Sequence, residues 1–80
     1  GDFTGANFTD CGLVSAQMRE GRFAGARFVD ADLFDADLGG ADLTGADFSG
    51  ARLTRVNLDG AKLEGAIFKG ALMPDGNEHP

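Results

Sequence analysis

The sequence predicts an all-β solenoid in which the chain winds around a four-sided apolar core, with twenty residues in each coil. Three observations predict it: a large apolar residue at every fifth position, a small residue two positions before each of these, and a second period of twenty residues. Short repeats in unbroken register are typical of solenoids, because each repeat buries its apolar side chains only against its neighbours.

The five-residue period runs from Phe3 to Met73 without a slip, and all fifteen of its central residues are large and apolar. We call each group of five residues a pentad and its third residue the centre. The first residue of a pentad is alanine in eleven cases. The other four first residues are Gly1, Cys11, Gly21 and Val56. The fifth residue is most often glycine or aspartate.

This period excludes the common regular elements. Steps of five residues rotate by about 140° on an α-helix, which would scatter the centres around the helix axis. On a straight strand an odd step sends successive centres to opposite faces. A chain that turns a corner after each pentad can point every centre inward, and glycine at the fifth position suits such a corner because it tolerates unusual backbone angles.

The second period decides the number of sides. Rows of twenty residues align a column of phenylalanines, a column of glycines and a column of alternating charge. These columns are Phe8, Phe28, Phe48 and Phe68; Gly5, Gly25, Gly45 and Gly65; and Asp2, Arg22, Asp42 and Lys62. The same rows place Arg27 beside Asp47 and Asp32 beside Arg52. Rows of fifteen, the three-sided alternative, mix phenylalanine with leucine and methionine in every column of centres. Four sides give 3.75 coils from fifteen pentads, and a length of about 18 Å at roughly 4.8 Å per coil.

The segments 31–33, 41–45 and 46–50 read ADL, ADLTG and ADFSG. They resemble the pentapeptide-repeat family, whose consensus is A(D/N)LxX, and the resemblance extends from residue 1 to about residue 75. It implies a right-handed quadrilateral β-helix with the first residue and the centre of each pentad inside. The second residue then faces outward, so departures from Asp or Asn there change the surface and leave the fold intact. These departures are Gly12, Gln17, Arg22, Arg27, Arg52, Lys62, Ile67 and Leu72.

The two ends of the solenoid are expected to differ. We expect the solenoid to occupy residues 1–73 and a turn and tail to occupy 74–80, because Pro74 cannot donate a hydrogen bond and Asp75-Gly76 is a turn signal. The first coil has no comparable device, and Phe3 and Phe8 would leave apolar surface and unpaired backbone there. We therefore expect this end to associate with a second copy, giving a homodimer, or with residues that precede Gly1.

Composition narrows the classes of partner and cofactor. The net charge of −6 argues against direct binding to nucleic acid or to an anionic membrane, and no apolar run is long enough to span a bilayer. Cys11 is the only cysteine, which fits a reducing, cytoplasmic location and the role of a small apolar filler. His79 is the only histidine, so no zinc ligand set is expected, and no cofactor motif is present.

Two surface features remain as a predicted partner surface. Six aspartates fall within eighteen residues: Asp30, Asp32, Asp35, Asp37, Asp42 and Asp47. They are read as solvated surface groups, with acid–base chemistry or cation binding as the alternatives; Asp10 and Asp30 should lie one coil apart and could recruit a cation. Phe34 is the only phenylalanine outside the centre positions, and it should either cover Val14 or anchor a partner.

The sequence indicates a non-catalytic structural or protein-interaction module, because it contains no nucleophile–base pair, no metal-ligand set and no cofactor motif. The alternative implied by the resemblance is a DNA mimic that binds DNA gyrase or topoisomerase, as some acidic family members do. A length of about 18 Å equals only about five base pairs at roughly 3.4 Å each. Basic residues also interrupt the acidic surface, which weakens this alternative, and an enzyme built on the same scaffold is less favoured still.

Overall fold

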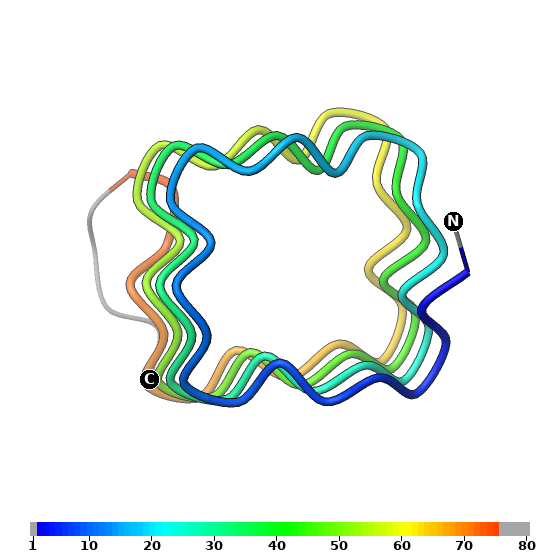
Figure 1. The fold of residues 1–80 in the computed structure, drawn as a ribbon, viewed down its shortest axis with the longest axis horizontal. Helices are drawn as coiled ribbons and strands as arrows, with labels where there is room; N and C mark the ends of the chain where they lie inside the picture. The colour runs from blue at the N-terminus through cyan, green and yellow to red at the C-terminus, as the bar shows by residue number, and fades with distance from the viewer. Residues whose placement is uncertain (1, 76–80) are drawn as a thin grey trace.

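The computed structural model describes residues 2–75, which form a right-handed solenoid with four walls (Figure 1). The chain runs clockwise in this view as it recedes from the N-terminal end. Within residues 2–75 there is no helix and no extended strand. Instead, the second residue of each pentad forms an isolated parallel bridge with the residue twenty positions later, from Asp2↔Arg22 to Arg52↔Leu72. The predicted period of twenty residues is confirmed.

We number the walls in chain order. Wall 1 contains residues 2–5, 21–25, 41–45 and 61–65; wall 2 contains 6–10, 26–30, 46–50 and 66–70; wall 3 contains 11–15, 31–35, 51–55 and 71–75; wall 4 contains 16–20, 36–40 and 56–60.

Three backbone hydrogen bonds join a pentad to the one stacked on it. On wall 2, the N–H groups of Phe28 and Asp30 donate to the carbonyls of Asp47 (2.7 Å) and Ser49 (2.9 Å), and the Asp47 N–H donates back to the Ala26 carbonyl (3.0 Å). These bonds form a ladder between the coils, which uses the N–H groups of the second, third and fifth residues of each pentad. The N–H of the fourth residue takes no part in it.

A tight turn forms each corner. The N–H of a pentad's first residue donates to the carbonyl of the preceding centre, as in Ala46 to Leu43 (3.0 Å). Every fifth residue from 5 to 70 has a φ between 58° and 73°, which is the left-handed angle that a type II turn needs at its third residue. Glycine occupies eight of these fourteen positions, which confirms the predicted role of glycine at the corner. Asp10, Ser15, Glu20, Asp30, Asp35 and Arg55 occupy the others.

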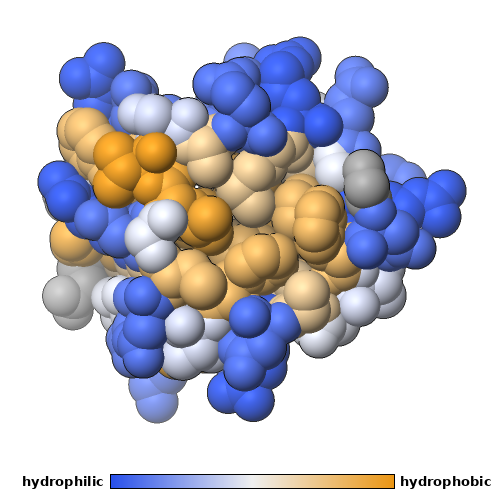
Figure 2. All heavy atoms as spheres, viewed as in Figure 1, coloured by the Kyte–Doolittle hydropathy of each residue, from blue (hydrophilic) through white to orange (hydrophobic). Residues whose placement is uncertain are grey.

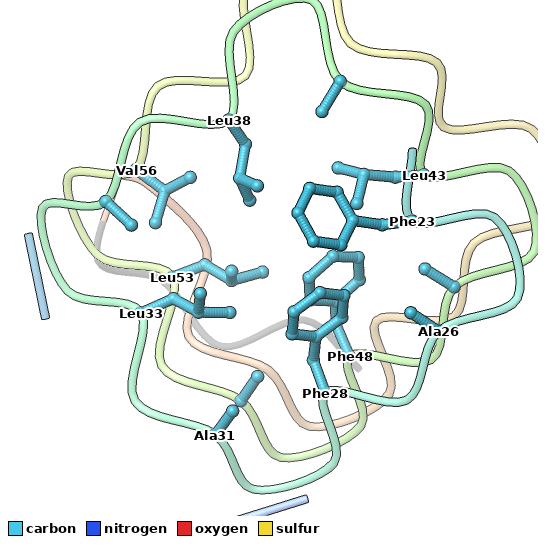
Figure 3. Close-up of a cluster of buried hydrophobic side chains, with 14 of the residues drawn as sticks. Phe23, Ala26, Phe28, Ala31, Leu33, Leu38, Leu43, Phe48, Leu53 and Val56 are labelled. Carbon is cyan, nitrogen blue, oxygen red and sulfur yellow. The ribbon is translucent and has the colours of Figure 1, made fainter. Parts of the chain in front are cut away.

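The core consists of the inward-pointing centres and first residues (Figure 3). The predicted phenylalanine column on wall 2 is a continuous stack: ring centroids lie 5.0 Å apart from Phe8 to Phe28, 4.8 Å from Phe28 to Phe48 and 5.3 Å from Phe48 to Phe68. The rings are within 9° of parallel. Burial of each such side chain contributes about 1.5–3 kcal/mol. Burial is complete in the middle of the solenoid and incomplete in the first coil, where Phe3 is 45% exposed.

The molecule is a block rather than a rod. Its extents are 28 × 22 × 18 Å, and the shortest lies along the solenoid axis (Figure 1). No helix within residues 2–75 is long and apolar enough to cross a membrane.

Pro74 takes part in the ladder as an acceptor. Its carbonyl accepts a hydrogen bond from the Arg55 N–H (3.2 Å). Pro74 is the fourth residue of its pentad, where the ladder requires no donor, so proline costs no interaction there. The rest of the expected tail, residues 76–80 with Gly76 and His79, lies outside the described residues.

Candidate functional site

The outer surface is organised by the carboxylates and amides at the second position of the pentads. The Asp42 carboxylate accepts hydrogen bonds from the hydroxyl (2.7 Å) and N–H (3.1 Å) of Thr44, and Asp47 accepts the same pair from Ser49 (2.6 and 2.9 Å). These carboxylates thus bind the fourth-residue N–H that the ladder leaves free. The hydroxyl and then the N–H of Thr44 lower the pKa of Asp42, and those of Ser49 lower the pKa of Asp47.

Sequence reasoning missed this role of the second-position aspartates. The available signal was a Thr or Ser two residues after Asp or Asn, which occurs in four pentads. Asp2 with Thr4 and Asn7 with Thr9 repeat the arrangement in the first coil. Short side-chain-to-backbone bonds of this type hold turns in place. The second position therefore has a structural function in addition to its charge.

The six clustered aspartates do not form one face. Asp32 and Asp35 lie on wall 3, Asp37 on wall 4, Asp42 on wall 1, and Asp47 and the corner residue Asp30 on wall 2. Within residues 2–75, no three His, Cys, Asp or Glu side chains come together closely enough to hold a metal ion. The Asp30 carboxylate lies against Gly50 on the following coil.

Phe34 belongs to a compact group of side chains on wall 3. The Arg52 guanidinium lies 4.5 Å from the Phe34 ring centroid and the Arg55 guanidinium 5.8 Å from it. Each arginine also pairs with an aspartate of Phe34's own pentad: Arg52 with Asp32 at 3.3 Å, as the twenty-residue rows predicted, and Arg55 with Asp35 at 3.7 Å. We call these five residues the Phe34 face.

Val14, one coil before Phe34, is 53% exposed, so any cover that Phe34 gives it is partial. Phe34 itself is half-buried, and it is covered from the other side by the arginines of the next coil. The sequence did not indicate this contact. Phe34 is the fourth residue of its pentad, Arg52 the second and Arg55 the fifth residue of the pentad stacked on it, so neither pair is twenty residues apart.

Other charged residues also interact between coils, some in direct contact and some at longer range. Wall 4 contains an ion pair between Arg19 and Asp37 (3.3 Å), and Asn57 donates to the same carboxylate (3.1 Å). The N–H of Gly39, followed by Arg19, lowers the pKa of Asp37. Arg27 contributes to the lowered pKa of Asp47 across the coils. Exposed pairs of this kind each contribute about 0–1 kcal/mol.

The N-terminal end presents a concave apolar surface. Phe3, Phe8, Leu13 and Met18, one centre from each wall, surround a depression of about 280 Å³ with Phe23 below it. Figure 2 shows this end as an apolar centre ringed by hydrophilic side chains. We call it the N-terminal face. Phe3 is exposed as predicted, whereas Phe8 is partly buried against Phe3 and Phe28. Cys11, also in the first coil, is half-buried.

Comparison with known proteins gives matches to repeat proteins. A family profile described as pentapeptide repeats matches eight copies over residues 31–70. The solved structure of Rfr23, a pentapeptide repeat protein from the cyanobacterium Cyanothece 51142, has a TM-score of 0.86 at 30% identity, with 88% of this chain and 48% of that one covered.

A second solved structure, alr5209 from Nostoc PCC 7120, also a pentapeptide repeat protein, has a TM-score of 0.80 at 35% identity, with 81% and 54% covered. This chain spans about half the length of both. No match was found among curated proteins.

Proposed function

The chain belongs to the pentapeptide-repeat family, and on that premise we propose that it is a non-catalytic module that presents side chains on its walls to a protein partner. One observation carries the proposal. Every buried side chain within residues 2–75 is apolar, and the titratable groups lie around a convex exterior. Acid–base catalysis needs groups that converge on one reacting atom. Side chains on four outward-facing walls point away from one another instead.

The Phe34 face is the part of the exterior best suited to a protein partner. Aromatic and arginine side chains are enriched at the centres of protein interfaces. Here both arginines are held by Phe34 and by aspartates of the neighbouring coil, at 3.3 and 3.7 Å. A group that is ordered before binding loses less side-chain entropy when a partner covers it. This face therefore combines suitable chemistry with side-chain contacts that already exist in the free chain.

Affinity capture under cross-linking, with the wild-type chain and two variants, tests the proposal. Phe34→Ala removes the centre of the Phe34 face. Lys62→Ala is the control, because Lys62 is an exposed residue on wall 1 with no ring contact. Matched thermal melts establish that both variants are folded. A protein captured by wild type and Lys62→Ala but not by Phe34→Ala supports the proposal. Equal capture by all three chains contradicts a role for this face.

Mimicry of DNA is the competing function, and the geometry does not favour it. The extent of 18 Å along the axis equals about five base pairs at roughly 3.4 Å each. Positive charges interrupt all four walls: Arg22 and Lys62 on wall 1, Arg27 and Lys69 on wall 2, Arg52 and Arg55 on wall 3, and Arg19 on wall 4. A gyrase supercoiling assay separates the two readings, since dose-dependent inhibition would replace the proposal by mimicry.

A further inference from the structure

Thr54 carries two hydrogen-bond donors without the acceptor that equivalent residues have. Within residues 2–75, five pentads have Thr or Ser at the fourth position. In four of them both the hydroxyl and the N–H donate to the side-chain oxygen of the second residue; these are Thr4, Thr9, Thr44 and Ser49. In the fifth pentad the second residue is Arg52, which has no acceptor. The hydroxyl and the N–H of Thr54 have no hydrogen-bond partner within residues 2–75.

The backbone at Thr54 has the same form as in the pentads that bind their own hydroxyl residue. The corner that follows has a φ of 64° at Arg55, against 69° at Gly45 in the pentad of Thr44. The N–H of Thr54 therefore points outward as that of Thr44 does. At Thr44 one carboxylate oxygen of Asp42 accepts both the hydroxyl (2.7 Å) and the N–H (3.1 Å). An oxygen from outside the chain can take the equivalent position at Thr54.

The two arginines that flank Thr54 favour a negatively charged acceptor. The guanidinium of Arg52 lies on the preceding coil, where it pairs with Asp32 and covers Phe34, and Arg55 turns the same way. Each uses one nitrogen for its aspartate, Nη1 in Arg52 and Nε in Arg55. A guanidinium has five N–H donors, so further donors remain beside those of Thr54. Hydrogen bonds to an ionised acceptor are roughly twice as strong as neutral ones.

The surroundings of Thr54 are apolar along the solenoid axis. The fourth residues of wall 3 are Val14, Phe34, Thr54 and Pro74, and only Thr54 has a polar side chain. Val14 is 53% exposed and Phe34 is half-buried. The coils on both sides of Thr54 lie within the described residues. A polar group set among apolar ones is typical of an interface core, where an apolar contact and a satisfied hydrogen bond occur together.

The net charge of wall 3 excludes a free anion as the preferred ligand. The three aspartates of this wall, Asp32, Asp35 and Asp75, outnumber its two arginines, so the wall does not attract small anions at long range. Selectivity then depends on the short-range donors of Thr54 and on contact with Phe34. The carboxylate that fits is attached to a group that also covers the aromatic ring.

We propose that the partner of the Phe34 face is a protein that places a carboxylate at Thr54, where it accepts from the hydroxyl and the N–H as Asp42 does at Thr44. An apolar or aromatic side chain next to that carboxylate covers Phe34. This rests on the proposed function, because it specifies the chemistry of the partner of the same face: an acidic residue beside an apolar one.

Amide NMR of the whole chain during titration with two peptides tests the proposal. The probes are the N-acetylated, C-amidated dipeptides Asp-Phe and Asn-Phe, which differ only in the carboxylate. We expect Asp-Phe at millimolar concentrations to shift the Thr54 N–H resonance in a saturable way. Asn-Phe should bind at least about fivefold more weakly, because its acceptor is neutral.

Thr54→Val removes the hydroxyl with little change of shape and should raise the dissociation constant of Asp-Phe about tenfold. Thr44→Val is the matched control, since that hydroxyl already donates to Asp42. It should change the dissociation constant by less than about twofold. Thermal melts establish that both variants are folded.

A second pair of variants separates the hydrogen bonds from the charge. Arg52→Asn and Arg52→Gln remove the same charge, but an asparagine at the second position can bind the donors of Thr54, as Asn7 binds those of Thr9 (2.6 and 3.0 Å). Glutamine is one methylene longer, and Gln17 makes no such bond within residues 2–75. Arg52→Asn should therefore abolish the shift of the Thr54 N–H, whereas Arg52→Gln should only weaken binding.

The proposal is overturned if Asp-Phe gives no saturable shift at Thr54, or if the two peptides bind equally well. Equal binding to Arg52→Asn and Arg52→Gln would also overturn it. The proposed function is decided separately by the capture experiment with Phe34→Ala. A captured protein that is lost with Phe34→Ala but retained in full by Thr54→Val leaves the proposed function standing and contradicts the carboxylate site alone.

Discussion

Replacing Phe48 by alanine removes a ring from the middle of the wall 2 stack. Phe48 is fully buried, and its ring lies between Phe28 at 4.8 Å and Phe68 at 5.3 Å. A buried Phe→Ala change costs about 3–5 kcal/mol, because the walls are joined by their ladders and cannot collapse into the cavity. A domain of this length has a total stability of about 4–12 kcal/mol. Phe48→Ala should therefore remove a large part of the free energy of unfolding.

Two comparisons make this prediction specific. Leu43 and Leu53 are fully buried centres of the same coil on the neighbouring walls, so leucine fits this kind of site, and Phe48→Leu should cost only the two ring contacts, about 1–3 kcal/mol. Phe3→Ala should cost roughly 1–2 kcal/mol, since Phe3 is 45% exposed. Urea unfolding followed by far-UV circular dichroism measures all three, as the chain has no Trp or Tyr. A cost for Phe48→Ala no greater than that for Phe3→Ala would refute the reasoning.

Three further predictions concern the corners, the aspartates and the Phe34 face. Gly25 has a φ of +68° and open space where a Cβ would stand, so Gly25→Ala should cost about 1 kcal/mol from the backbone angle alone. Ser15 has a φ of 60°, so Ser15→Gly should raise the melting temperature. Equal melting temperatures in both variants and the wild type would contradict this prediction. The folded-state pKa values of Asp2, Asp37, Asp42 and Asp47 are lowered, so their stabilisation is complete above about pH 4, the ordinary aspartate range, and is lost as the pH falls through the lower folded values. Thermal melts from pH 7 to pH 2 should show this loss, with a shallower decline in Asp42→Asn, which keeps an acceptor for Thr44 but does not titrate. Arg52→Ala should lower the free energy of unfolding by about 0.5–2 kcal/mol, because it removes the ion pair with Asp32 and the contact with Phe34. Lys62→Ala should lower it by less than about 0.5 kcal/mol. The difference between the urea midpoints of the two variants measures this.

Much of the core was predictable because it depends on period alone. Once the chain turns a corner every five residues around four walls, residues twenty positions apart lie one above the other, and the sequence then says which side chains these are. The Phe8 to Phe68 column and the Asp32–Arg52 pair followed directly from that count. Position along a strict repeat is equivalent to position in space, which is seldom true of a globular chain.

The surface was less predictable, since it depends on hydrogen bonds that the period does not specify. The fourth-residue N–H is free of the ladder, and this explains both the carboxylate bonds to Thr44 and Ser49 and the tolerance of Pro74. Closeness in sequence does not give the position of the aspartates around the molecule. Residues five apart lie on different walls, so a cluster along the chain becomes a ring around the molecule.

The sequence by itself determined the period, the number of walls and the interior of this protein, because the five-residue repeat requires a corner after each pentad and the columns twenty residues apart favour four sides. Only the tertiary structure decided which surface groups meet. Phe34 is covered by Arg52 and Arg55 through a diagonal contact between coils, and the Asp42 and Asp47 carboxylates bind the N–H groups of Thr44 and Ser49. Both depend on side-chain reach, which a repeat pattern does not contain.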